Sequence, residues 1–187
     1  MFSKAQRMRR VFASDGRTLI VAMDHAGYMG PVEGLIDPVA TVRHVVAGGA
    51  DAVMTTLGTA RRILDALDGR GLVLSVDLHA PDPVAVVESA IALGADSLKT
   101  LAYWGGDDLA GWRNFGRYAV LCDRWGLPFQ AEAAGVRAAV ASGIVVTLTP
   151  FTYGGDALGD ACEERFPMAD AARAATQALR RLFGERG

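Results

Sequence analysis

Residues 18–38, T-L-I-V-A-M-D-H-A-G-Y-M-G-P-V-E-G-L-I-D-P, decide the fold of this chain. The apolar run 19–23 predicts a buried strand, which ends on Asp24 and His25 and opens into a glycine-rich loop. Ligands of parallel α/β proteins bind at the carboxyl ends of the strands, so Asp24 and His25 are candidate functional residues. Asp37 and Pro38 suit the N-cap and the first position of the next helix.

The bulk properties favour one globular domain over residues 1–187 that acts on small molecules. The net charge of -2 and the pI near 5.9 provide no basic field, so we expect no nucleic-acid partner and no anionic membrane partner. Two cysteines without C-x-x-C spacing fit a reducing compartment, and we expect a cytoplasmic protein. The basic segment 1–12 predicts a short amphipathic helix that closes one end of the fold, rather than a signal peptide.

A self-similar segment organises the middle of the chain. V-V-A-G-G-A-D-A-V-M-T-T-L-G from Val45 recurs as A-I-A-L-G-A-D-S-L-K-T-L-A-Y-W-G-G from Ala90, and more weakly from Ala139. Each copy reads as a helix end, a glycine stop and a short buried strand, which is typical of repeated αβ units. We predict strands near 19–24, 51–56, 72–77, 95–102, 128–133 and 144–149, and helices near 38–48, 59–67, 83–93, 107–125, 135–142 and 167–183.

These units predict an α/β fold with a TIM-barrel-like (β/α) repeat of about six units. A closed barrel has eight units and typically roughly 250 residues, and this chain has 187. Three explanations stay open: a partial barrel, a barrel completed by a partner, and a chain that has lost part of its length. Because an open sheet edge invites association, we expect a homo-oligomer.

Lys99 is the candidate nucleophile. Of the 19 basic residues only Lys4 and Lys99 are lysines, and Lys4 falls in the solvated amino-terminal segment. A Schiff-base mechanism needs a lysine that is poorly solvated and partly neutral. Lys99 lies in an otherwise apolar predicted strand, which suits that task. Alternatively, Lys99 pairs with a neighbouring acid or extends to the rim of the fold.

Further candidates follow other predicted strands. Asp24 suits a general base, or it caps the following loop. Imidazole and carboxylate side chains that gather at strand ends are also potential ligands of zinc or manganese, although no metal-binding spacing supports this reading. That set comprises Asp24, His25, Asp77 and His79. Later in the chain, Gly154 and Gly155 could offer backbone N–H groups to a phosphate, or form a simple turn.

Three motifs in order resemble a known enzyme family. The pattern M-D-H, then G-P, then G-L-x-D-P resembles the DhnA-type class I aldolases, the archaeal-type fructose-bisphosphate aldolases and their relatives in the DeoC/FbaB/LacD group. The resemblance covers roughly residues 8 to 134, and residues 135–187 carry no motif of the family. The matching residues are Met23-Asp24-His25, Gly30-Pro31 and Gly34-Leu35-Ile36-Asp37-Pro38, followed by the segments 49–58 and 122–128.

The resemblance implies reversible carbon–carbon cleavage or condensation of a sugar-phosphate-like carbonyl compound, without a metal or another cofactor. In this reading Lys99 forms the imine and Asp24 moves the proton. The substrate would be oriented by His25 and bound by Asp77, Tyr103, Glu132, Gly154 and Gly155.

Two departures from the family pattern leave alternatives open. By linear order Lys99 is on the fourth strand, whereas the family carries its imine-forming lysine on the sixth, so Lys99 is either a relocated nucleophile or not a nucleophile. Ala134 occupies the place of the family's tyrosine after strand five, with Glu132 nearby. The alternatives are a metal-assisted lyase or hydrolase that uses Asp24, His25, Asp77 and His79, and an inactive partial barrel with a binding or assembly role.

Overall fold

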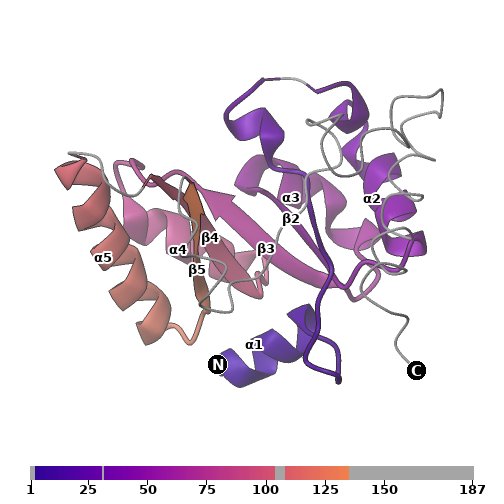
Figure 1. Cartoon of the computed structure of the whole chain (residues 1–187), viewed down its shortest axis with the longest axis horizontal. Helices are drawn as coiled ribbons and strands as arrows, with labels where there is room; N and C mark the ends of the chain where they lie inside the picture. Colours follow the sequence, from indigo (N-terminus) through magenta and orange to yellow (C-terminus); the bar gives the residue numbers. More distant parts are fainter. Residues whose placement is uncertain (1–2, 31, 104–107, 135–187) are drawn as a thin grey trace.

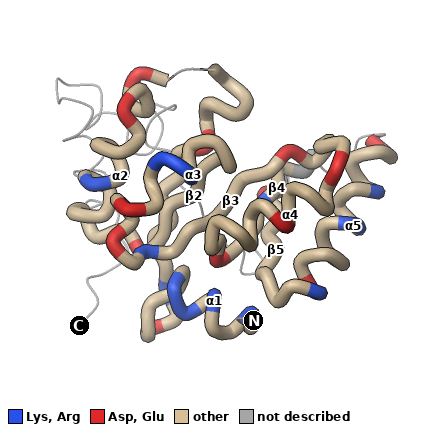
Figure 2. Tube along the Cα trace, turned by 180° about the vertical axis from the view of Figure 1, so that it is seen from behind, with Lys and Arg blue, Asp and Glu red and all other residues tan. Residues whose placement is uncertain are grey.

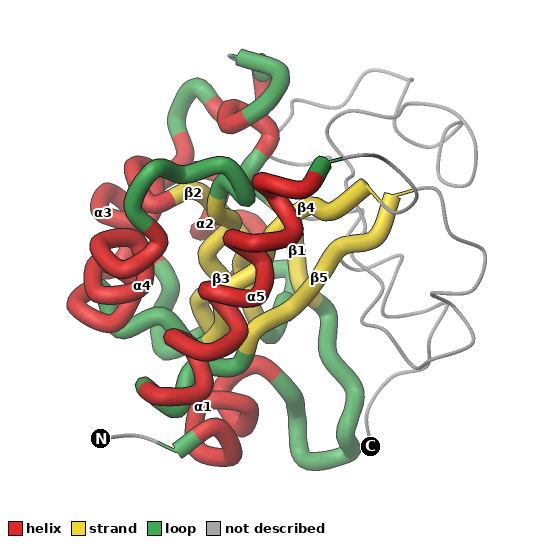
Figure 3. The backbone as a smooth tube through the Cα atoms, turned by 90° about the vertical axis from the view of Figure 1, so that its left-hand side faces the viewer, coloured by secondary structure: helices red, strands yellow, loops and turns green. Residues whose placement is uncertain are grey.

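The computed structural model describes residues 3–30, 32–103 and 108–134, which form a curled parallel sheet with helices. All strand pairs are parallel and neighbours in the sequence are neighbours in the sheet, in the order β1-β2-β3-β4-β5. Figures 1 and 3 show the strands as one curved layer. The strands are β1 (Ile20–Ala22), β2 (Ala52–Thr56), β3 (Gly71–Val76), β4 (Ser97–Tyr103) and β5 (Phe129–Ala134).

Helices cover the outer face of this half-barrel. Each of α2 to α5 contributes apolar side chains to one core that also contains Val53, Leu72 and Leu98 of the sheet. Among the described helices, none combines the length and apolar character that a bilayer crossing requires. The helices are α1 (Lys4–Val11), α2 (Pro38–Ala47), α3 (Leu57–Ile63), α4 (Pro83–Ala92) and α5 (Leu109–Arg124), with 3-10 turns η1 (His25–Gly27), η2 (Glu33–Leu35) and η3 (Leu64–Ala66).

The inner face of the sheet has a separate, smaller apolar core at its amino-terminal end. Side chains alternate between the faces of a strand, so neighbours in sequence enter different cores. Val21 packs in the outer core, whereas Ile20 and Ala22 pack in the inner one. The inner core is completed by Ala52, Met54 and Val73 and is covered by Val11 and Phe12 of the amino-terminal segment.

Helix α1 closes the amino-terminal end of the half-barrel, as the sequence predicted. Arg7 is buried, and its Nη1 donates to the carbonyl oxygen of Ala95 over 2.5 Å. The backbone of α1 also approaches β3 closely, because a Cβ at Gly71 would lie 2.7 Å from the carbonyl oxygen of Arg10. Glycine at position 71 therefore allows α1 to dock (Figure 1).

The two strongest copies of the repeat have the same structure and the same function in the fold. Each turns through a glycine with positive φ, at Gly49 (φ 90°) and Gly94 (φ 73°), which suits a residue without a Cβ. The aspartate two residues later accepts a hydrogen bond from a backbone N–H at the start of the neighbouring strand, within one residue of its first position. Asp51 bonds Leu19 N at 2.7 Å, and Asp96 bonds Leu72 N at 3.0 Å.

The fold prediction is confirmed, with differences at the element boundaries. The first strand is shorter than the predicted 19–24, because the chain turns into η1 directly after Asp24. The helix predicted at 59–67 begins at Leu57, where the Thr56 hydroxyl caps it by accepting from Thr59 N. The predicted strand 144–149 and the helices 135–142 and 167–183 lie outside the described residues.

Candidate active site

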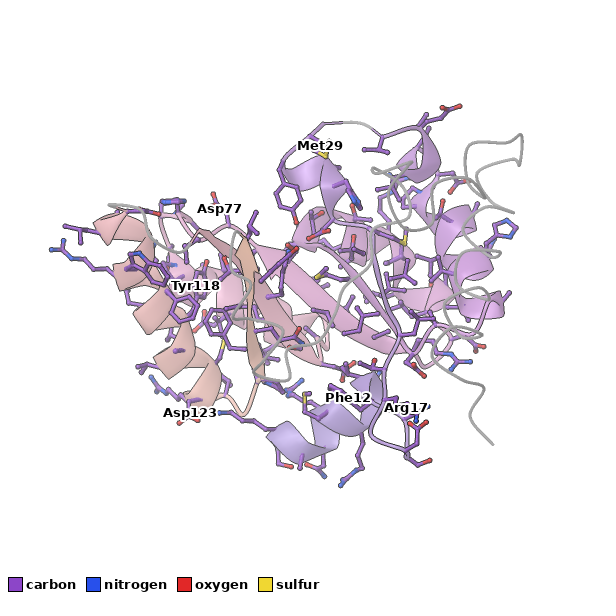
Figure 4. All side chains as sticks on the ribbon, viewed as in Figure 1. Phe12, Arg17, Met29, Asp77, Tyr118 and Asp123 are labelled. Carbon is purple, nitrogen blue, oxygen red and sulfur yellow. The ribbon has the colours of Figure 1, made fainter. Side chains whose placement is uncertain are left out.

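A cleft of about 570 Å³ opens at the carboxyl ends of the strands. Its walls come from the ends of β2 and β3 and from the segments that follow β1, β2 and β3, with Val86 of α4, Leu101 of β4 and Asp108 at the start of α5. Figure 4 shows Met29 and Asp77 at this edge of the molecule, opposite Phe12 and Arg17. The strands β2 and β3 carry no charged residue within their bounds, as Figure 2 shows. Within the described strands, the charged side chains nearest the cleft therefore come from β4 and β5, at Lys99 and Glu132.

Lys99 lies beneath this cleft and contacts two carboxylates. Its Nζ is 3.2 Å from Oδ2 of Asp24 and 3.5 Å from Oγ of Ser75, and it forms a close ion pair with Glu132. The Lys99 and Asp24 side chains are 4% and 3% exposed, whereas the Glu132 side chain is 44% exposed. The predicted acid and the buried amine are therefore in direct contact, and Ser75 and Tyr28 connect them to the cleft.

The strand register explains why these residues meet. Leu98 packs in the outer core, so its neighbour Lys99 projects to the inner face. Lys99 is paired with Ser75 of β3 on one side and with Gln130 of β5 on the other. Asp24 follows the carboxyl end of β1, and the curvature of the sheet brings it within reach of the Lys99 amine.

Tyr28 joins Lys99, Asp24, Glu132 and Ser75 in one charge cluster, and the sequence patterns did not predict it. Its hydroxyl donates a short hydrogen bond to Oδ2 of Asp24. The same oxygen lies 3.2 Å from Oγ of Ser75 and 3.3 Å from Nζ of Lys99. The residue is half-exposed and lines the cleft. The available signal was a hydroxyl-bearing aromatic residue four positions after Asp24 in a glycine-rich loop.

The acid and the amine stabilise each other's charged forms. Burial opposes ionisation of Asp24, but the Lys99 ammonium and hydrogen bonds to Ser75 and Tyr28 outweigh it, so the pKa of Asp24 is lowered. Burial likewise disfavours the Lys99 ammonium, but the charges of Asp24 and Glu132 prevail, so the pKa of Lys99 is raised. Without a substrate the site therefore holds an ion pair.

The pKa values of the two neighbouring ring side chains shift in opposite directions. Burial and the hydrogen bond to Asp24 raise the pKa of Tyr28, so its phenol stays protonated at neutral pH. Burial lowers the pKa of His25, although the nearby Asp24 charge opposes this. His25 is 3% exposed and starts η1, so it supports the turn that carries Tyr28.

Asp24 does not cap the loop that follows it, which was the structural alternative for this residue. No side-chain capping bond links it to η1, and its Oδ2 instead accepts from Tyr28 and Lys99. Asp77, by contrast, has a turn-stabilising contact, because its Oδ1 accepts from His79 N over 2.9 Å. Asp77 still lines the cleft and remains a candidate for substrate binding.

The proposed metal ligands do not gather into one group. Asp24 and His25 are buried, whereas the side chains of His79 and Asp77 are 57% and 72% exposed at the cleft mouth. His79 Nε2 is 2.7 Å from Oδ2 of Asp108 instead. Within the described part of the chain, no three His, Cys, Asp or Glu side chains form a potential metal site.

Of the remaining predicted substrate ligands, Glu132 lies wholly within the described structure. Glu132 contacts Lys99 directly, so this predicted substrate ligand also belongs to the charge cluster. The backbone of Tyr103 ends β4 in register with Ala134, and its side chain lies outside the described structure. Gly154 and Gly155 lie outside the described residues as well.

Solved structures of fructose-1,6-bisphosphate aldolases have a similar fold. One is a Schiff-base-forming fructose-1,6-bisphosphate aldolase, with a TM-score of 0.56 and 25% identity over 69% of this chain and 56% of that one. Another is an archaeal fructose-1,6-bisphosphate aldolase whose catalytic lysine is bound to the carbinolamine intermediate. It gives a TM-score of 0.56 at 24% identity and covers 72% of this chain and 60% of that one.

Curated relatives include a 2-amino-3,7-dideoxy-D-threo-hept-6-ulosonate synthase of Halobacterium salinarum. It is 35% identical over 103 residues, which are 51% of this chain and 38% of the relative. An uncharacterized aldolase of Saccharolobus solfataricus is 28% identical over 153 residues, which are 71% of this chain and 56% of the relative. The chain thus spans only about 38% to 56% of these relatives' lengths.

The sequence pattern of a whole family also matches most of the described structure. The match runs over residues 18–142 and includes all five strands together with Asp24, Tyr28, Lys99 and Glu132. It begins just before β1, the strand that leads into Asp24. This chain therefore belongs to the DeoC/LacD family of aldolases.

Proposed function

We propose that this protein is a class I aldolase-like lyase that reversibly cleaves a carbon–carbon bond in a sugar-phosphate-type carbonyl compound. The observation that carries the proposal is the buried amine of Lys99, 3.2 Å from the Asp24 carboxylate beneath a cleft at the carboxyl ends of the strands. We infer the substrate class from the names of the similar proteins, a fructose-1,6-bisphosphate aldolase and an ulosonate synthase.

Lys99 is the proposed nucleophile. Its Nζ attacks the substrate carbonyl, and loss of water leaves an iminium ion that accepts the electron pair of the breaking carbon–carbon bond. The attacking amine must be neutral, although both carboxylates favour the ammonium. Glu132 is half-exposed at the edge of the cluster, so a bound substrate can displace it. Only the Asp24 carboxylate then raises the pKa of Lys99, while burial still lowers it, so the neutral amine becomes more accessible.

Asp24 is the proposed electrostatic partner of the iminium ion. Its lowered pKa keeps it ionised across the neutral range, and it lies next to the atom where positive charge is fixed. A preformed carboxylate at that position stabilises the charge without reorganisation of solvent. Asp77 lines the same cleft and would bind hydroxyl groups of the substrate, with Glu132. The proposed mechanism uses no metal.

Borohydride trapping tests this function directly. The folded protein is incubated with fructose 1,6-bisphosphate or dihydroxyacetone phosphate, treated with sodium borohydride, and analysed by peptide mass spectrometry. Reduction of the iminium ion fixes the ligand on the lysine as a secondary amine. We expect one adduct per chain, on the peptide that contains Lys99.

The chain offers a matched control, because Lys4 is its only other lysine. Lys4 lies on α1, with its side chain 50% exposed, and is ion-paired with Asp123 at 2.6 Å. The variant Lys4→Met should retain the adduct, and Lys99→Met should lose it. A folded wild-type sample without an adduct at Lys99, or with equal labelling of Lys4, would contradict the class I mechanism.

We also propose that the protein is a homo-oligomer. The two outer strands, β1 and β5, each have one strand neighbour within the described sheet, and such edges favour association. Sedimentation velocity at several protein concentrations measures the assembly state. A monomer at all concentrations would contradict this part of the proposal.

A further inference from the structure

Tyr28 combines two properties that the other members of the charge cluster do not share. Its hydroxyl touches Asp24 and lies 3.3 Å from the Lys99 amine, so it is next to the site of imine formation. The residue is also 53% exposed and lines the cleft from which a substrate would enter. Asp24 is 2% exposed and lies behind it.

We propose that Tyr28 is the general acid and base of the reaction, the residue that transfers protons between the substrate and the site. This inference rests on the proposed function, because it presupposes an imine at Lys99. It assigns proton transfer to the loop after β1. The family's tyrosine after strand five has no counterpart at Ala134.

The first half of the cycle consumes the phenol proton. The neutral Lys99 amine adds to the substrate carbonyl to form a carbinolamine. The carbon–oxygen bond then breaks, Tyr28 gives its proton to the departing hydroxide, and the products are water, an iminium ion and a Tyr28 phenolate. The phenolate forms beside the positive charge of the iminium ion, which compensates for the neighbouring Asp24 carboxylate.

The second half of the cycle restores the phenol proton. The phenolate takes the proton of the substrate hydroxyl as the carbon–carbon bond breaks, and the electron pair moves to the iminium nitrogen to give an enamine and an aldehyde. Tyr28 then protonates the enamine carbon. When water adds to the resulting iminium ion, its proton returns to Tyr28, and the ketone and the Lys99 amine are released.

The other titratable groups around Tyr28 fit this task less well. Asp24 has a lowered pKa and is a poor proton donor near neutral pH. His25 is 3% exposed and does not line the cleft. Glu132 approaches Lys99 from β5, but it directly favours the ammonium rather than the imine. Ser75, whose Oγ lies 3.2 Å from the Tyr28 hydroxyl, orients that hydroxyl from β3.

Two measurements report the two steps separately: borohydride trapping reports imine formation, and deuterium incorporation into the ligand reports proton transfer at carbon. An enamine formed from dihydroxyacetone phosphate takes up deuterium at carbon in D₂O, and this incorporation is followed by NMR. In Tyr28→Phe we expect borohydride to trap the Lys99 adduct after long incubation, whereas the rate of deuterium incorporation falls by about 10²- to 10⁴-fold, the usual contribution of a general acid or base. A rate within a few-fold of the wild type would overturn the role of Tyr28.

A second tyrosine provides the matched control. Tyr118 lies on α5, is fully buried, and donates its hydroxyl to the carbonyl oxygen of Asp77 over 3.1 Å. Tyr118→Phe makes the same chemical change outside the charge cluster and should leave deuterium incorporation unchanged. Circular dichroism verifies that both variants are folded.

The pattern of results distinguishes the two proposals. A wild-type protein with neither adduct nor exchange would overturn the aldolase function, and the role of Tyr28 with it. A wild-type protein with an adduct and exchange, together with a Tyr28→Phe variant that exchanges normally, would overturn only the role of Tyr28. Loss of exchange with retention of the adduct supports both proposals.

Discussion

The two ends of the barrel interior differ sharply, although they are built from the same strands. At the amino end the inward side chains of β1, β2 and β3 are apolar, and α1 covers them. At the carboxyl end the inward positions are occupied by Ser75, Lys99 and Glu132, with Asp24 beyond the end of β1. Ala22 and Val73 of the first set lie two residues before Asp24 and Ser75 of the second set.

The same strands thus carry an apolar layer that stabilises the fold and, nearer their carboxyl ends, an ionic layer that contains the candidate active site. The register that pairs Met54 with Val73 also pairs Thr56 with Ser75, so the two layers are geometrically linked. The apolar layer needs no partners beyond close packing, whereas each charge in the ionic layer needs another charge. Substitutions in the apolar layer should therefore destabilise the protein through lost packing, and substitutions in the ionic layer through unpaired buried charge.

The largest expected effect is at Lys99. Lys99→Met leaves the buried Asp24 without its cation, and removal of one partner of a buried pair costs about 4 kcal/mol of unfolding free energy. Urea denaturation monitored by circular dichroism measures this loss. The double variant Lys99→Met, Asp24→Asn removes both charges and should recover part of it. A single variant as stable as the wild type would show that the ionic layer adds little to the fold.

The next largest effect is expected in the apolar layer. Met54 is 2% exposed in the inner core, and Met54→Ala should lower the unfolding free energy by about 3 kcal/mol through lost burial and a cavity. Met29 is 60% exposed, and Met29→Ala is the matched control with a change below about 0.5 kcal/mol. Equal losses at both sites would contradict the existence of the separate inner core. Thermal and urea unfolding give the comparison.

A smaller loss is expected where α1 closes the apolar end. Gly71→Ala places a Cβ 2.7 Å from the carbonyl oxygen of Arg10, so α1 must shift, at a cost of about 2 kcal/mol. Gly116 lies within α5, and a Cβ added there would meet no atom within 4 Å, so Gly116→Ala should instead stabilise the helix by about 1 kcal/mol. Opposite signs in urea denaturation support the docking of α1, and a neutral Gly71→Ala would contradict it.

The smallest effect on stability is expected at Glu132. Its side chain is 44% exposed, so Glu132→Gln should cost less than about 1 kcal/mol. The pKa of Lys99 should fall, because one of the two carboxylates that raise it is removed. Borohydride trapping should then reach half of its maximum at a lower pH than in the wild type.

The raised pKa of Lys99 also makes the stability of the folded protein depend on pH in the alkaline range. A raised pKa of Lys99 stabilises the folded state below the unfolded pKa of the amine, and this contribution disappears as pH rises through the folded pKa. Glu132→Gln should therefore lose less stability than the wild type in that alkaline range. Glu88, exposed on α4, provides the control variant Glu88→Gln with an unchanged trapping profile.

Most of the described fold could be predicted from local patterns. Near-continuous apolar runs indicated parallel strands, and the pairs Asp37-Pro38 and Asp82-Pro83 located helix starts that the structure confirms. The rule that chemistry collects at the carboxyl ends of strands also led to Asp24, and the scarcity of lysine in the chain led to Lys99. Strand alternation places Lys99 on the inner face, and the curvature of the sheet then brings it within 3.2 Å of Asp24.

The missed residues depend on geometry that no local pattern contains. Tyr28 reaches Asp24 because η1 folds the loop back over β1, and a glycine-rich segment does not specify that turn. Ser75 sits in an apolar strand where a small hydroxyl side chain indicates packing as readily as function. The direct contact of Glu132 with Lys99 depends on the β4–β5 register, in which Lys99 pairs with Gln130.

The turns at Asp51 and Asp96 are equivalent in sequence and in hydrogen bonding. Each aspartate ties the start of an odd-numbered strand to the even-numbered strand that follows, so β1–β2 and β3–β4 are equivalent modules. A scaffold made of two such modules is what duplication of an ancestral two-stranded segment would leave behind. Only the second copy places a lysine in its strand, at Lys99, where the first has Met54. Divergence of one module could thus add reactivity while the other preserved the architecture.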